Sequence, residues 1–337
     1  MKTADTQYFG IKSRDFFALL IAYMLAHAGT FLILNAVYWD DWTLYNVDPA
    51  SIIRDYAMYG WIFNWPFHLY NSLFSLSLLS WIYRVLTFIL MFIAGISLWK
   101  ITERNNWIAY EDRFIITLLF LVLPFNWARI EMINFAYVLC YFTFFLAWYF
   151  IGRSRILALC LFLFSFNTAS LLVFFALPMS DWYFRDNDTY HFKSGMIWVL
   201  KRIDYFVLPF AYWIVKRVYF RPYGLLAGYN EHFSVKNLTT SPIIMAHDFS
   251  HLDINIFLCS CLFIFFMFII RKQGDGNHKS DGRRMLIAGS AALICAVFPY
   301  WIIGDAPTFF EWTSRHQLLM PLGIALLLVC MLQRLTS

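Results

Sequence analysis

The chain has 337 residues, of which 61% are hydrophobic, 21% are aromatic and only 14% are charged. Soluble domains carry about 25% charged residues, so this composition excludes an ordinary soluble protein and indicates an integral membrane protein. The net charge of +5 does not predict a nucleic-acid partner, because the basic residues form short clusters between apolar runs, where they orient membrane helices. We expect a single transmembrane domain over residues 1–337, without a separate soluble domain.

The apolar segments, taken in chain order, predict the membrane helices. A span needs about 20 mostly apolar residues. The first segment, 16–37, follows Lys2, Lys12 and Arg14 and is longer than a signal-peptide core, so we expect it to remain as the first membrane helix. The candidate spans are 16–37, 81–99, 114–125, 133–151, 203–219, 252–270, 285–303 and 317–332.

The segment 156–179 decides the predicted topology. If it crosses the membrane once, the most basic loop, 271–284, falls outside the cytoplasm, against the positive-inside rule. If it is a hairpin of two short helices broken near Ser165 to Thr168, every basic cluster becomes cytoplasmic. Such a break is tolerated at membrane depth where protein or a wet cavity surrounds it. We therefore predict an all-α polytopic bundle of about 10 transmembrane segments that includes this hairpin; the alternative is a single helix with a weaker charge bias.

This topology places four stretches outside the cytoplasm. In the first, Asp48 and Pro49 form a typical helix start, because Asp caps helices and Pro is favoured at their first position. The aromatic residues that follow suit the membrane interface, so we expect one or two helices lying along the membrane surface. The four stretches are 39–80, 126–131, 220–250 and 304–316.

The acidic candidates for a functional site lie in the first two of these stretches. Asp40 and Asp41 are adjacent at the end of the first helix, and carboxylates so close raise each other's pKa unless a cation or donor compensates. The pair suits a general base or a divalent cation; alternatively, it simply ends the helix in water. Glu131 is a third acid, and Arg129 beside it is also consistent with a local ion pair.

The basic candidates lie in the last two stretches. Arg315 and His316 precede the final helix, and arginine holds phosphate through several donors, although an arginine at a helix end also commonly extends to the interface. Lys216, Arg217 and Arg221 lie near one another, where they could hold an anionic head group or anchor the interface.

His247 and His251 have the four-residue spacing of two metal ligands on one helical face. However, Ser250 and Asp253 form an S-x-x-D capping pattern before 252–270. This pattern predicts that His247 precedes the helix, so we expect no zinc site. The sequence contains no P-loop, G-x-G-x-x-G, G-x-S-x-G or C-x-x-C motif.

Together, these positions resemble the GT-C superfamily of membrane glycosyltransferases, particularly the branch of protein mannosyltransferases and aminoarabinose transferases. Asp40 and Asp41, followed by Tyr45, are similar to the acidic pair in the first extracytoplasmic loop of those enzymes. The sequence PFNWARIE, at 124–131, resembles the proline, arginine and acid of their next outer junction. The broken hairpin and the sequence SRHQLLMP before the last helix are also similar to family features.

The resemblance implies a GT-C-like bundle that transfers one sugar, with inversion, from a polyprenyl-phosphate donor. The acceptor would be a glycan, lipid or protein at the periplasmic face of a bacterial inner membrane. Asp41 or Asp40 would be the general base, with Glu131 as a further acid. A metal would not be required, although a divalent ion could bind at the acidic pair. The donor phosphate would be held by Arg315, His316, Arg129, Arg221, Arg217 and Lys216.

Two other interpretations of the sequence stay open. A polymerase or ligase of lipid-linked glycans such as O-antigen would depend on arginine and histidine, with the acidic pair dispensable. A flippase or transporter of lipid-linked sugars would carry charged residues deep within its helices, and Arg84 is the chief example here.

Overall fold

The computed structural model describes residues 7–27, 38, 41, 48–64, 76–186, 192–228, 233–251, 265, 280–309 and 312–336. Within these ranges the chain is mostly α-helical, as predicted. A two-stranded antiparallel hairpin, β1 (Gln7–Tyr8) and β2 (Ile11–Lys12), precedes the first helix. The described helices are α1 (Ser13–His27), α3 (Pro49–Met58), α5 (Leu76–Thr102), α6 (Tyr110–Val122), α7 (Phe135–Phe150), α8 (Arg155–Ser165), α9 (Ser170–Phe174), α10 (Ala176–Asp186), α11 (Phe192–Lys201), α12 (Ile203–Tyr219), α13 (Asn237–Ser250), α15 (Gly282–Ile303) and α16 (Met320–Thr336), with the 3-10 helices η2 (Trp127–Ile130), η3 (Gly224–Leu226) and η4 (Trp312–Gln317).

Two helices in these ranges are long and apolar enough to cross a membrane: Trp81–Thr102, within α5, and Gly282–Ile303, which is α15. Each has 22 residues, which gives a length of about 33 Å and matches a hydrocarbon core of about 30 Å. Both coincide with predicted spans. They support a membrane protein, while the total of about ten segments stays a prediction.

The other predicted spans meet the structure in different ways. α6 covers 114–122 of the span predicted at 114–125, α7 covers 135–150 of the one at 133–151, and α12 covers the whole of 203–219. α16 begins at Met320 rather than at residue 317, because the preceding residues form η4. The predicted helix start at Asp48 is confirmed, since its carboxylate accepts a hydrogen bond from the Ser51 N–H at 3.0 Å. Residues 28–37, and 252–270 apart from Phe265, lie outside the described residues.

The broken hairpin predicted within 156–179 is confirmed. α8 ends at Ser165, α9 begins at Ser170, and the chain returns along α10 until Trp182 lies beside Gly152, close to the start of α8. Asn167, in the break, is 3% exposed. Its side-chain oxygen accepts hydrogen bonds from the N–H groups of Ile62 and Phe63 at 3.1 and 3.3 Å. The interrupted backbone therefore packs against protein, as interruptions at membrane depth require.

α15 and α16 pack against each other more closely than ordinary side chains allow. A Cβ atom added at Gly323 would lie 2.6 Å from the backbone nitrogen of Leu293, and one at Gly289 would lie 3.2 Å from the Gly323 carbonyl oxygen. Small residues permit this backbone approach, which is a common way to join helices in membranes. α15 also packs against α9 and α13, and α16 packs against α6, while α7 packs against both α5 and α8.

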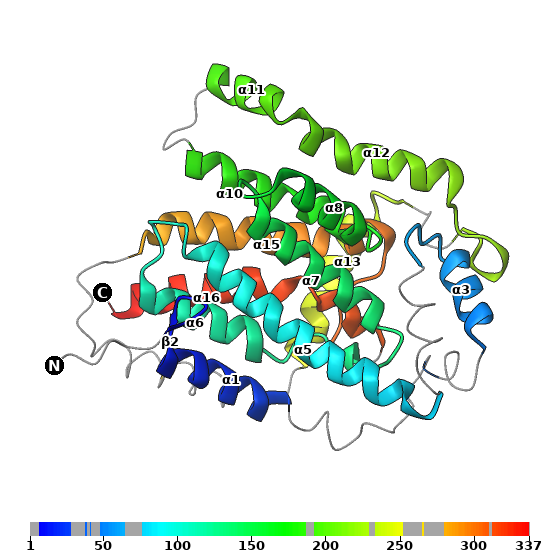
Figure 1. Cartoon of the computed structure of the whole chain (residues 1–337), viewed down its shortest axis with the longest axis horizontal. Helices are drawn as coiled ribbons and strands as arrows, with labels where there is room; N and C mark the ends of the chain where they lie inside the picture. Colours follow the sequence, from blue (N-terminus) through cyan, green and yellow to red (C-terminus); the bar gives the residue numbers. More distant parts are fainter. Residues whose placement is uncertain are drawn as a thin grey trace.

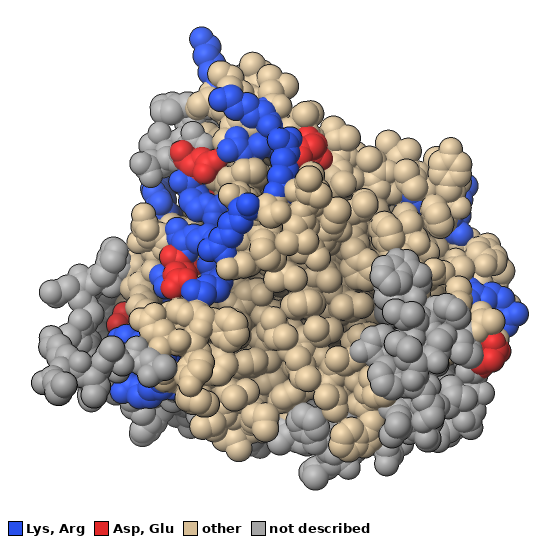
Figure 2. All heavy atoms as spheres, viewed as in Figure 1, with Lys and Arg blue, Asp and Glu red and all other residues tan. Residues whose placement is uncertain are grey.

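Most of the predicted cytoplasmic basic clusters with described residues gather at one end of the bundle, on the left in Figure 1. Figure 2 shows many Lys and Arg side chains on that side of the visible face. Contacts between distant segments fix the arrangement: Lys12 lies 5.0 Å from the Tyr110 ring centroid, and Arg155 pairs with Asp204 at 2.7 Å. The charge-based topology predicts this gathering. We call it the cationic end, defined by Lys12, Lys100, Arg104, Arg153, Arg155, Lys201, Arg202 and Arg284.

The prediction that His247 lies outside a helix, in the chain that precedes 252–270, is wrong. α13 continues to Ser250, so His247 lies inside a helix and its Nε2 atom is 3.2 Å from Nε2 of His251. Ser250 ends this helix, and its hydroxyl donates to the His247 carbonyl at 2.6 Å. Within the described ranges, no group of three or more His, Cys, Asp or Glu side chains could hold a metal ion, so nothing adds a third ligand to the two imidazoles there.

Candidate functional site

Two 3-10 helices meet at the end of the bundle opposite the cationic end. The Ser314 hydroxyl in η4 accepts a hydrogen bond from the Ala128 N–H in η2 at 2.8 Å. Likewise, the Gln317 side-chain oxygen accepts one from the Asn126 N–H at 3.1 Å. All four residues are buried. We call this contact the η2–η4 junction, made of residues 126–131 and 312–317.

The junction brings together candidates that are far apart in the sequence. Arg129 and Glu131 come from its first segment, and Arg315 and His316 come from its second. The sequence predicts that these four residues share one end of the molecule, and the structure places them there. α6, which precedes η2, and α16, which follows η4, run along the bundle between the cationic end and the junction. The basic clusters and the junction therefore lie at opposite ends of the same helices.

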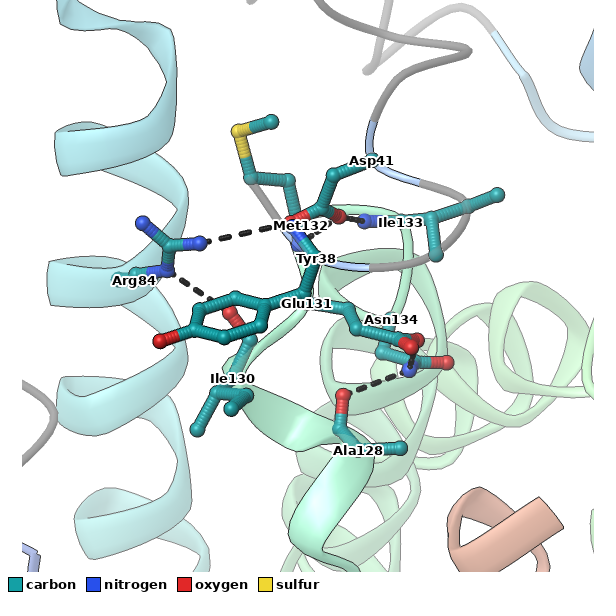
Figure 3. A network of polar contacts seen from close by, with 9 residues as sticks. All are labelled: Tyr38, Asp41, Arg84, Ala128, Ile130, Glu131, Met132, Ile133 and Asn134. Carbon is teal, nitrogen blue, oxygen red and sulfur yellow. Dashed lines mark hydrogen bonds and ion pairs between the residues drawn. The ribbon is translucent and has the colours of Figure 1, made fainter. Parts of the chain in front are cut away.

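Asp41 is joined to this junction by its carboxylate (Figure 3). Oδ1 accepts hydrogen bonds from the N–H groups of Met132 and Ile133, at 2.6 and 3.3 Å. Oδ2 accepts one from the Tyr38 N–H at 3.2 Å and contacts the Arg84 guanidinium at 3.4 Å. Asp41 is fully buried, with 0% of its surface exposed. Its four donors therefore tie the segment after α1 to the residues that follow η2.

Arg84 was named from the sequence only under the transporter interpretation, and not among the candidate site residues. It lies in α5, is 1% exposed, and donates from Nε to the Ile130 carbonyl at 2.8 Å. Its guanidinium lies 5.4 Å from the centroid of the Tyr38 ring. An arginine inside an otherwise apolar span is itself a signal of function or of a buried partner, and here the partner is Asp41.

The electrostatic state of Asp41 follows from two opposing effects. Burial raises the pKa of the carboxyl group above its ordinary value, and its three backbone N–H donors and Arg84 offset only part of this shift. A carboxylate with every oxygen already engaged by two donors is well suited to positioning a loop. One of these donors would have to be given up before an oxygen of Asp41 could accept a proton from a substrate. The neighbouring Asp40 lies outside the described residues.

Glu131 and Arg129 point to different partners. Glu131 is 2% exposed, and the Asn134 amide donates both to its carboxylate and to the Ala128 carbonyl. The Arg129 guanidinium contacts the imidazole of His27 at the end of α1. The structure therefore ties both side chains into the packing of the junction, in addition to any role toward a ligand.

His316 and Arg315 differ in burial. His316 is 6% exposed and stacks on Tyr300, with 4.4 Å between ring centroids, and the Tyr300 hydroxyl bonds Ser170 of the hairpin at 3.1 Å. Burial, assisted by nearby Arg315, lowers the pKa of His316 to about 3, so its imidazole is neutral at physiological pH. Arg315 is half-buried, and its guanidinium lies 5.9 Å from the centroid of the Tyr137 ring.

The remaining basic candidates lie on the last turns of α12 and just beyond it. Lys216 donates from Nζ to the Asn167 carbonyl at 3.5 Å, which places it at the break of the hairpin. Arg221 is exposed, and its Nε donates to the Arg217 carbonyl at 2.5 Å. Thus Lys216 approaches the interior beside the hairpin, whereas Arg221 lies at the surface.

Comparison with protein-family models, with curated proteins and with solved structures gives no match to this chain. The function is therefore argued from the site itself. The junction combines buried carboxylates, a neutral histidine and a half-buried arginine set against an aromatic ring. Such a set can bind a phosphate through Arg315 and hold an acidic loop in a fixed position.

Proposed function

We propose that the chain is a polytopic membrane glycosyltransferase of the GT-C type, with about 10 transmembrane segments, in a bacterial inner membrane. It would transfer a sugar from a polyprenyl-phosphate donor to a glycan, lipid or protein acceptor at the periplasmic face. The observation that carries the proposal is the η2–η4 junction. It brings Arg129 and Glu131, from one predicted outer stretch, together with Arg315 and His316, from another, at the end opposite the cationic end.

The proposed reaction is an inverting displacement at the anomeric carbon. The acceptor oxygen attacks that carbon, its proton passes to a carboxylate, and the bond from the carbon to the phosphate oxygen breaks. Polyprenyl phosphate leaves with its new negative charge beside Arg315, because a fixed guanidinium stabilises charge that develops in the transition state. Arg129, His316 and Lys216 line the approach to this position in the proposal, and no metal is required.

The carboxylates have different proposed roles. Asp41 is a positioning residue, since its two oxygens already accept from four donors. Asp40, the other acid of the pair, is therefore the proposed proton acceptor. Glu131 ties the end of η2 to the start of α7 through Asn134. General-base assistance of this kind contributes about 10²–10⁴ in rate.

The saturated state of Asp41 also favours a second candidate, a polymerase or ligase of lipid-linked glycans. In such an enzyme the arginines would carry the reaction and the acidic pair would be structural. The two candidates differ in one respect that can be measured: only the first requires a carboxylate at position 40.

The experiment that tests the proposal is a transfer assay in membranes with a panel of labelled polyprenyl-phosphate sugars. Asp40→Asn should reduce transfer at least about 100-fold while leaving the amount of folded protein unchanged. Asp41→Asn should reduce both transfer and stability. If Asp40→Asn and Asp41→Asn both transfer sugar at the wild-type rate, the acidic pair has no part in the reaction. If the wild type transfers none of the sugars, the donor class is wrong.

A further inference from the structure

A cavity of about 420 Å³ opens at the cationic end, between the start of α8 and the turn from α11 to α12. Its volume lies within the range of about 300–1,000 Å³ that is common for small-molecule sites. It lies on the opposite end of the bundle from the η2–η4 junction, so it is independent of the proposed reaction. Its lining includes Arg153, Arg155, Trp182, Lys201, Arg202 and Tyr205.

The cavity has more positive than negative charge. Arg155 pairs with Asp204 at 2.7 Å, and Arg202 pairs with Asp186 at 2.8 Å. Four cationic side chains less these two carboxylates leave two positive charges. An excess of this kind attracts an anion with one or two negative charges.

The two cations that provide the excess are Arg153 and Lys201. Among the described residues, neither has an acidic partner within ion-pair distance. The Arg153 guanidinium lies 4.1 Å from the Tyr149 ring centroid, and Arg202 lies 4.3 Å from that of Trp182. Stacking holds these planar groups in place, so less side-chain entropy is lost when they donate to a phosphate.

Exposed apolar side chains lie directly beside these cations in the sequence. Ile156, Leu200 and Ile203 are 78%, 62% and 49% exposed. A free inorganic anion gains nothing from such neighbours, whereas the acyl chains of a lipid would cover them. Trp182 and Tyr205 are of the types that concentrate at the level of lipid head groups.

We propose that this cavity binds the head-group phosphate of an anionic phospholipid. The phosphate would be held by Arg153 and Lys201, with the ion-paired Arg155 and Arg202 around it, and the acyl chains would lie along the exposed apolar side chains. Basic pockets between membrane helices are suited to such head groups.

The test is native mass spectrometry of the full chain in detergent, titrated with phosphatidylglycerol, with phosphatidylcholine and with inorganic phosphate. We expect saturable binding of phosphatidylglycerol that is stronger than that of phosphatidylcholine and is not displaced by inorganic phosphate at the same concentration. In Arg153→Gln/Lys201→Gln, this binding should weaken about 25-fold, since each basic residue near an anionic surface contributes roughly a factor of five.

The matched control is Arg54→Gln/Lys236→Gln, which removes the same charge from two exposed residues outside the cavity. It should bind phosphatidylglycerol as the wild type does. Equal weakening in the two double variants would overturn the proposal, because it would reduce the effect to net charge. Equal binding of both lipids, or displacement by inorganic phosphate, would also overturn it. Thermal unfolding of each variant verifies that the exposed substitutions leave the fold intact.

Discussion

Substitution of Asp41 tests the role assigned to the buried ion pair. Asp41 is 0% exposed and Arg84 is 1% exposed, so removal of either charge leaves the other buried without compensation. Breaking such a pair typically costs about 3–5 kcal/mol. In Asp41→Asn, an amide NH₂ group also replaces one of the two carboxylate oxygens, so it faces N–H donors that it cannot accept from. We therefore expect Asp41→Asn to lower the free energy of unfolding by about 3–5 kcal/mol.

The assay is reversible unfolding in mixed micelles with increasing dodecyl sulfate, followed by tryptophan fluorescence. Arg84→Met should be destabilising too, and the double variant should lose at least about 1 kcal/mol less than the sum of the single losses. Asp48→Asn, at the exposed cap of α3, is the matched control, because Asn caps helices about as well as Asp. The reasoning is refuted if Asp41→Asn costs no more than this control, or if the losses at positions 41 and 84 simply add.

Three further predictions concern other parts of the structure. The pKa of His316 is lowered to about 3 in the folded state, against about 6.5 in the unfolded state. The neutral imidazole therefore stabilises the fold fully above a pH of about 6.5, and this stabilisation is lost as the pH falls toward about 3. We expect the free energy of unfolding to fall by about 2 kcal/mol between pH 7 and pH 5. His316→Phe should remove that part of the pH dependence in chemical unfolding, and an unchanged dependence would contradict the assignment. Gly323→Val should cost at least about 2 kcal/mol, measured as a lower unfolding midpoint, because even a Cβ there would lie 2.6 Å from the Leu293 nitrogen; a neutral effect would argue against the close helix contact. Asn167→Ala should speed hydrogen exchange at the N–H groups of Ile62 and Phe63, which now donate to its side chain, and wild-type exchange rates would contradict that contact.

The sequence predicted the features that depend on charge and hydrophobic pattern. The positive-inside rule required a break near Asn167, and the structure contains it. The same rule predicts that 126–131 and 304–316 lie on one side of the membrane, and in the structure η2 and η4, which carry Arg129 and Arg315, pack against each other. These features follow from one-dimensional information because each helix that crosses the bundle fixes the end at which the next loop lies.

Other features required tertiary contacts that no local pattern encodes. The acidic pair offered Asp41 or Asp40 as the general base, but the partners of Asp41 are backbone N–H groups about 90 residues away and a guanidinium in α5. The S-x-x-D pattern at Ser250 predicted a helix start, whereas α13 continues to that residue. A capping pattern indicates that a side chain can accept from the first backbone N–H groups of a following helix. It does not exclude another helix that ends at the same residue.

The measurement that tests the central claim most directly compares two arginines at opposite ends of the molecule. Arg315 is proposed to hold the donor phosphate, and Arg14, whose side chain is 86% exposed, belongs to the basic residues before the first predicted span. In the transfer assay with polyprenyl-phosphate sugars, Arg315→Gln should lower the rate at least about 100-fold, and Arg14→Gln should keep the wild-type rate. Equal rates in the two variants would contradict the assignment of the reaction to the η2–η4 junction.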